Sequence, residues 1–219
     1  MSNERRAGRQ KAVSSLKRGL ILDAARAVFE NEGLDGASLR AIAVAAGYTP
    51  AALYFHFDSK EAIYAEVLRE SLAKLGQTVD RAVSRCKRPV DRLRAAAIAF
   101  FRYYAENPRD LDLGFYLFRG GMKPHGLGKE RDVMLNTALK AALHPIFEAA
   151  RGLGAASEDA RLLMVDTFAH AAGLLLLAHT GRIRMFGVSA SDLMQRFIES
   201  KITALTEKKR RIARGAMKL

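Results

Sequence analysis

The chain has 219 residues, of which 49% are hydrophobic, and it carries a formal net charge of +13. This apolar content is enough for a folded core and excludes a wholly disordered chain. The positive charge gathers at the ends, because residues 1–18 and 201–219 carry six and seven basic side chains, each against one acidic side chain. Basic ends favour a polyanionic partner such as nucleic acid, with solvated ends that serve only solubility as the alternative.

Other features narrow the class of protein. The single cysteine, Cys86, excludes an intrachain disulfide, and the N-terminal residues lack the apolar run of a secretory signal, so a cytoplasmic location is expected. The longest strongly apolar stretch, Ala169–Ala178, is shorter than the roughly 20 residues of a membrane-spanning helix, so no membrane partner is expected. The 5 histidines lack metal-site spacing, and no nucleophile or phosphate-loop motif is present. We therefore expect no metal, no cofactor and no enzymatic activity.

The chain is predicted to be all-α, because apolar residues recur at helical spacing and strand-like alternation is absent. Gly33 is expected to end the first helix, and the Gly- and Pro-rich residues 120–128 predict a loop. The predicted helices are Leu20–Glu32, Leu39–Ala45, Pro50–Tyr54, Ser59 to beyond Val79, Val90–Glu106, Arg109–Phe118, Lys129–Arg151, Glu158–Thr180 and Ala190–Glu207.

Residues 38–57, SLRAIAVAAGYTPAALYFHF, have the residue pattern of a helix-turn-helix, with two short helices joined by a turn that contains a glycine. Ser38 and Thr49 are expected to cap the two short helices, with Pro50 at the first position of the second one. Gly47 supplies the turn between them, which takes one residue through a conformation that side chains resist. The apolar positions predicted to hold the two helices together are Ile42, Ala45 and Leu53.

Residues 20–68 resemble the N-terminal domain of the tetracycline-repressor (TetR) family. The resemblance rests on a first helix ending in FENEGLDGAS and on LRAIAVAAGYTPAALYFHFDSKEAIYAEVL, where the Leu-Tyr-x-His-Phe-x-x-Lys run of residues 53–60 is the most specific part. It implies a helix-turn-helix DNA-binding domain (19–66) and a helical ligand-binding and dimerisation domain (67–207). The distribution of charge adds a basic flexible arm (1–18) and a basic tail (208–219).

The resemblance also implies DNA-contacting residues. Arg40 can reach a phosphate or a guanine edge, the start of the second short helix can enter the major groove, and polar side chains beyond it can bind phosphates. That helix offers few hydrogen-bonding groups to base edges, so recognition is expected to use Arg40, thymine methyl groups, DNA shape or the arm as well. The predicted DNA-binding residues are Ser38, Arg40, Thr49, Pro50, Ala51, Tyr54, His56 and Lys60.

Dimerisation and ligand binding are expected of the second domain. The run Phe168–Ala178 is apolar nearly all round, which predicts burial on every side, either within one subunit or in the four-helix dimer interface that the resemblance implies. An effector pocket would be lined by aromatic and flexible side chains, although such residues can equally be core. The candidates are Phe101, Tyr104, Phe115, Tyr116, Phe118, Met122, His125 and Phe168.

These patterns together predict a homodimeric, sequence-specific transcriptional regulator. It is expected to act as a repressor that leaves a palindromic operator when a small apolar or aromatic effector binds. One alternative is a DNA-binding regulator without a small-molecule effector. Another is a non-specific architectural DNA binder that relies on its basic ends.

Overall fold

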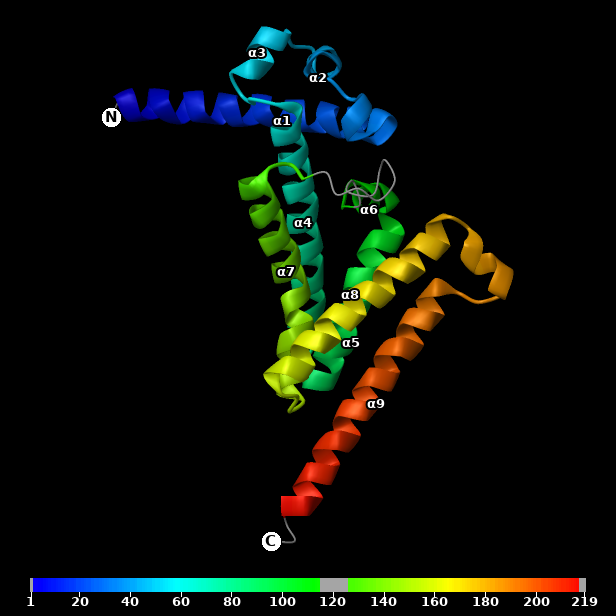
Figure 1. The fold of residues 1–219 in the computed structure, drawn as a ribbon. Coiled ribbons are helices and arrows are strands. Elements are labelled where there is room, and N and C mark those ends of the chain that lie inside the picture. The colour runs from blue at the N-terminus through cyan, green and yellow to red at the C-terminus, as the bar shows by residue number, and fades with distance from the viewer. Residues whose placement is uncertain (1, 115–125, 217–219) are drawn as a thin grey trace. The chain divides into compact units, whose positions relative to one another are not determined.

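The computed structural model describes residues 2–114 and 126–216, and every element that it describes there is a helix (Figure 1). The prediction of an all-α chain is therefore confirmed for these residues. The chain forms two compact units. The first consists of the residues up to Ser71 together with the described part of Arg109–Leu135, and the second of Leu72–Pro108 together with the chain from Asn136 onward.

The first unit holds the predicted helix-turn-helix at the predicted positions. It contains α1 (Ser2–Gly36), α2 (Leu39–Ala45), α3 (Pro50–Tyr54), the first part of α4 (Lys60–Ser84), most of α6 (Pro108–Gly114) and the start of α7 (Lys129–Gly152). Its core is formed by side chains of α1, α2, α3 and α4, among them Ile21, Phe29, Ile42, Leu53 and Ile63.

The helix α1 is longer than the predicted Leu20–Glu32. It begins at Ser2, so the segment expected to be a flexible arm is helical in the structure (blue in Figure 1). Ala, Arg, Gln, Lys and Leu dominate this segment, and their high helix propensity extends the helix backward from its packed part. Gly33 leaves the helical conformation at φ 71°, as its predicted role at the end of the helix requires.

The second unit is built around three helices that pack against one another, α5 (Pro89–Glu106), α8 (Ser157–His179) and α9 (Ala190–Ala216). The short 3-10 helix η2 (Arg182–Phe186) connects the last two. Arg94 of α5 donates two hydrogen bonds to the Glu199 carboxylate of α9, and these bonds hold the pKa of Glu199 below its usual range despite partial burial. Helix α9 continues beyond the predicted end at Glu207, so the start of the expected basic tail is helical as well.

Helix α8 is not buried on every side within one chain. Ala160, Leu163, Ala171 and Leu175 are buried, whereas Leu162 and Leu176 are 50% and 61% exposed. Over its 23 residues α8 is long and apolar enough to cross a membrane by length and composition, which the shorter apolar run alone did not indicate. The core helix of a soluble protein meets the same measure, and Asp166 of α8 forms a 2.7 Å ion pair with Lys201 of α9.

Candidate nucleic-acid interface

The turn between α2 and α3 is held by backbone hydrogen bonds. The amide of Ala46 donates to Ile42 at 2.9 Å, and the amide of Tyr48 donates to the Ala43 carbonyl at 2.9 Å. Gly47 lies between them at φ 71°, in the left-handed region where a Cβ atom is disfavoured. The glycine is therefore required by the conformation of this turn.

A Gly47→Ala variant is expected to lose about 1–2 kcal/mol of stability, because nothing crowds the position and only the left-handed backbone is strained. Gly47→Asn should lose less, since asparagine tolerates this region better. Thermal unfolding of the two variants checks the ranking. Equal melting temperatures for both variants and the parent would contradict it.

Hydroxyl groups cap both short helices. The Ser38 hydroxyl accepts a hydrogen bond from the amide of Ala41 at 3.1 Å, and the Thr49 hydroxyl accepts one from the amide of Ala52 at 3.2 Å. Pro50 follows at the first helical position, where a missing N–H group has no consequence. Each cap uses an oxygen lone pair, so the O–H hydrogen of both residues can still donate to an external oxygen.

The buried side of the helix-turn-helix fixes which residues face outward. Ile42, Ala43 and Leu53 are completely buried, and Phe57 is nearly so. Ala45, which the sequence placed in this contact, is exposed, because the inner face of α2 follows the helical spacing of Leu39, Ile42, Ala43 and Ala46 and leaves Ala45 outside it. The opposite side exposes Arg40, Thr49, Pro50 and Ala51.

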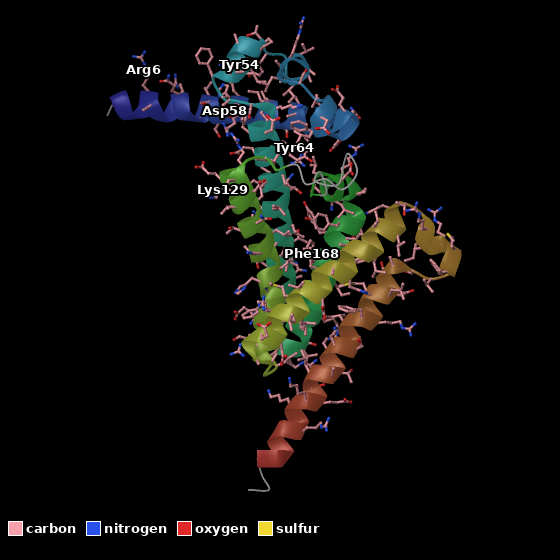
Figure 2. The ribbon with its side chains drawn as sticks, viewed as in Figure 1. Arg6, Tyr54, Asp58, Tyr64, Lys129 and Phe168 are labelled. Carbon is pink, nitrogen blue, oxygen red and sulfur yellow. The ribbon has the colours of Figure 1, made fainter. Side chains whose placement is uncertain are left out.

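Aromatic side chains extend this exposed face beyond the end of α3. Tyr54 is 60% exposed (labelled in Figure 2), and His56 is half-buried. Phe55 is 89% exposed, and it was not among the residues predicted to bind DNA. Its position between Tyr54 and His56 was the available signal. The outer face therefore combines few hydrogen-bonding groups with a large apolar area.

Arg18 supports this region from α1. Its guanidinium group lies 4.2 Å from the centre of the Phe57 ring, donates to the His56 carbonyl at 3.0 Å and pairs with Glu66 at 3.1 Å. Burial raises the pKa of Glu66, but its hydrogen bonds and charge interactions with Arg69 and Arg18 outweigh this and hold it below its usual value. The sequence analysis counted Arg18 with the arm. Its helical spacing from Ile21 and Leu22, on the inner face of α1, was the signal that it missed.

Lys60 is placed differently from the other predicted contacts. Its ammonium group donates to the backbone carbonyls of Leu34, Asp35 and Ala37, at 2.9, 3.3 and 3.1 Å. Its interactions thus lie within the chain. A contact between this lysine and DNA stays a prediction of the sequence.

Helix α6 belongs to the first unit, although the sequence analysis assigned its residues to the second domain. Asp110 is buried and forms a 2.9 Å ion pair with Arg26 of α1. The Tyr64 hydroxyl of α4 donates to the Leu113 carbonyl at 2.9 Å. Polar contacts of buried groups therefore attach α6 to the helices that carry the candidate DNA-binding face.

The described candidates for an effector pocket lie in α5 and α8. Phe101 and Tyr104 are buried in α5, and Phe168 of α8 (labelled in Figure 2) lies edge-to-face with Phe100 at 6.0 Å between ring centres. In the described part of the chain, no group of three or more His, Cys, Asp or Glu side chains is placed to hold a metal ion. The remaining candidates lie outside the described residues: Phe115, Tyr116, Phe118, Met122 and His125.

Residues 21–67, which comprise most of this unit's helical core and the whole helix-turn-helix, match the model of the family described as bacterial regulatory proteins, tetR family. This part of the chain is a domain of the TetR family. The resemblance inferred from residues 20–68 is thereby confirmed.

Curated TetR-family relatives match part of the chain. The transcriptional activator FasR of Mycolicibacterium smegmatis is 35% identical over 99 residues, which cover 45% of this chain and 45% of FasR. The transcriptional repressor KstR2 of Mycobacterium tuberculosis is 36% identical over 85 residues, which cover 39% of this chain and 42% of KstR2. The matches thus span less than half the length of these relatives.

The fold likeness extends further than the sequence likeness. The transcriptional regulator FadR of Bacillus subtilis superposes with a TM-score of 0.64 at 18% identity, over 82% of this chain and 95% of FadR. Its fold is therefore shared across both the DNA-binding element and the helices that follow.

Proposed function

We propose that this TetR-family regulator is a homodimeric repressor that binds a palindromic operator and releases it when a small apolar effector binds. The observation that carries the DNA-binding part is the construction of the helix-turn-helix. Gly47 and the Ser38 and Thr49 caps fix two short helices, whose apolar sides are buried and whose outer face exposes Arg40, Thr49 and Tyr54.

In the proposed complex, α3 enters the major groove. Thr49 can donate its free hydroxyl hydrogen to a base edge, while Pro50 and Ala51 contact thymine methyl groups. Arg40 reaches a phosphate or a guanine, and the hydroxyl groups of Ser38 and Tyr54 and the His56 ring bind phosphate oxygens. The contacts to the backbone set the register, and those to bases set sequence preference.

The proposed dimer uses α8. Its exposed residues follow one side of the helix at spacings of three or four, so they form a single apolar stripe: Leu162, Val165, Ala169, Gly173 and Leu176. Such a stripe is typical of a helix that packs on another helix. TetR-family regulators usually act as dimers, and a two-fold protein matches a palindromic operator.

The proposed effector contains an apolar group. The FadR structure of similar fold holds stearoyl-CoA, whose acyl chain is apolar. For this chain, Phe101, Tyr104 and Phe168 are the described candidates for the effector's surroundings. Helix α6 follows α5 in the chain after Asn107, and Asp110 holds α6 to α1.

Selection from a pool of randomised duplexes, at about 150 mM salt where weak electrostatic binding is screened, tests this proposal. We expect enrichment of a palindrome. Retained binding at low salt without any enriched sequence would overturn it in favour of an architectural DNA binder. Addition of long-chain acyl-CoA to the selected complex then tests release. Binding that no such compound weakens would favour a regulator without a small-molecule effector of this class.

Arg40→Gln is expected to weaken binding to the selected duplex by about tenfold and, if Arg40 neutralises a phosphate, to reduce the slope of log affinity against log salt by about 0.9. Arg102→Gln, which removes an exposed arginine of α5 in the second unit, is the matched control and should change neither quantity. Fluorescence anisotropy at four or more salt concentrations measures both. Equal losses in the two variants would show that overall charge, and no contact by Arg40, sets the affinity.

A further inference from the structure

The side chain of Lys60 uses its hydrogen-bonding capacity inside the chain. A lysine ammonium group has three N–H donors and no acceptor. Three backbone carbonyls lie within 3.3 Å of its nitrogen, those of Leu34, Asp35 and Ala37. Each donor therefore has a partner in the protein, and none is left over for a phosphate oxygen.

The position of these carbonyls explains why a cation lies there. Leu34 and Asp35 follow Gly33, where α1 leaves the helical conformation. The carbonyl groups of this short segment lie beyond the kink of α1, and no long helix continues past them to supply backbone donors, so they are available to a cation. The start of α4, by contrast, disfavours a positive charge on its first residue. The carbonyl groups at the end of α1 therefore explain why a positive charge is favoured at residue 60, whereas the dipole of α4 does not.

The bonds of Lys60 join the two ends of the helix-turn-helix. Ala37 immediately precedes Ser38, the cap of α2, and Lys60 immediately follows Ser59, whose hydroxyl accepts from the Ala62 amide at 3.1 Å and caps α4. The side chain of Lys60 therefore closes residues 38–59, which include α2 and α3, into one loop.

We infer that Lys60 is a positioning residue, which fixes α2 and α3 by clamping both ends of the helix-turn-helix and does not bind DNA. This inference rests on the proposed DNA-binding function and changes the role that family resemblance gives to the lysine. An ammonium group that is held by three carbonyls lowers the freedom of the segment before α2, so the recognition face is ordered before DNA arrives.

The experiment compares Lys60→Met, which keeps most of the aliphatic stem, with Lys60→Arg, which keeps the charge. A planar guanidinium group binds phosphate at least as well as an ammonium, but it does not match three carbonyls that converge on one nitrogen. For both variants we expect a melting temperature lower by about 4–8 °C and faster amide exchange in α2. We also expect affinity for the selected duplex to fall about tenfold, with an unchanged salt slope.

A phosphate contact would give the opposite pattern. Lys60→Met would reduce the salt slope by about 0.9, as Arg40→Gln is expected to do, and Lys60→Arg would keep the affinity of the parent. Either result would overturn the inference. Melting and amide exchange require no DNA. They therefore test whether Lys60 holds the two ends of the helix-turn-helix together even if the parent selects no duplex and the proposed function fails. Unchanged melting and exchange in both variants would overturn it as well.

Discussion

An Asp110→Ala variant is expected to lose about 3 kcal/mol of stability in the DNA-binding unit, which corresponds to a melting temperature lower by about 6–12 °C. The Asp110 carboxylate is buried and lies 2.9 Å from the Arg26 guanidinium group, whose side chain is only 19% exposed. Removal of the carboxylate leaves a mostly buried positive charge without its nearest partner, and that is far costlier than loss of an exposed pair. Circular dichroism during heating measures the shift.

Glu70→Ala is the matched control, because Glu70 is the other carboxylate near Arg26. It lies 3.7 Å away and its side chain is 37% exposed, so solvent screens the pair and we expect a loss below about 1 kcal/mol. Amide exchange in α1 and α6 separates a local effect from a global one. If the two variants have the same melting temperature, the attachment of α6 does not depend on the Arg26–Asp110 pair.

A Leu176→Glu variant is expected to abolish the proposed dimer and, with it, to weaken operator binding by about 100-fold or more. Leu176 is 61% exposed on the apolar stripe of α8, and a two-fold contact would bring two added carboxylates into an apolar interface. Binding of both half-sites gains about 10²–10⁴ in affinity from linkage, which a monomer lacks. Sedimentation velocity gives the oligomeric state, and anisotropy gives the affinity.

Leu16→Glu serves as the control for the oligomeric state, since Leu16 is a similarly exposed leucine (67%) of α1 and is not part of the stripe. It should leave the sedimentation coefficient of the parent unchanged. A Leu176→Glu protein that still sediments as a dimer would place the subunit contact elsewhere. Dissociation of both variants would mean that added charge, and no particular face, disrupts the assembly.

The sequence predicts the helix-turn-helix well because the signals that shape it are local. Ser38, Thr49 and Pro50 determine where α2 and α3 begin, through bonds to amides three residues away or through a fixed φ. Gly47 marks a turn that few other residues allow. The bounds of both helices follow from these positions alone.

Contacts between residues far apart in the chain could not be predicted from the sequence. Arg26 and Asp110 are separated by 84 positions, and nothing in either local pattern indicates their pairing. The sequence around Lys60 is that of a surface lysine, and its contacts with the end of α1 become visible only in the folded chain. The helical start of α1 was missed for another reason: its basic residues suggested an arm, although their helix propensity is high.

The sparse outer face of α3 has a consequence for how new binding preferences can arise. Ala51 is exposed and carries only a methyl group, so its replacement by Gln, Asn or Arg would add groups that read bases without removing an existing contact of the core. Such residues differ from alanine by only a few tenths of a kcal/mol to about 0.7 kcal/mol in helix propensity, which the buried Leu53 and the two caps can tolerate. Duplicated copies of such a gene can therefore diverge toward different operators by gain of contacts, with the scaffold left intact at each step.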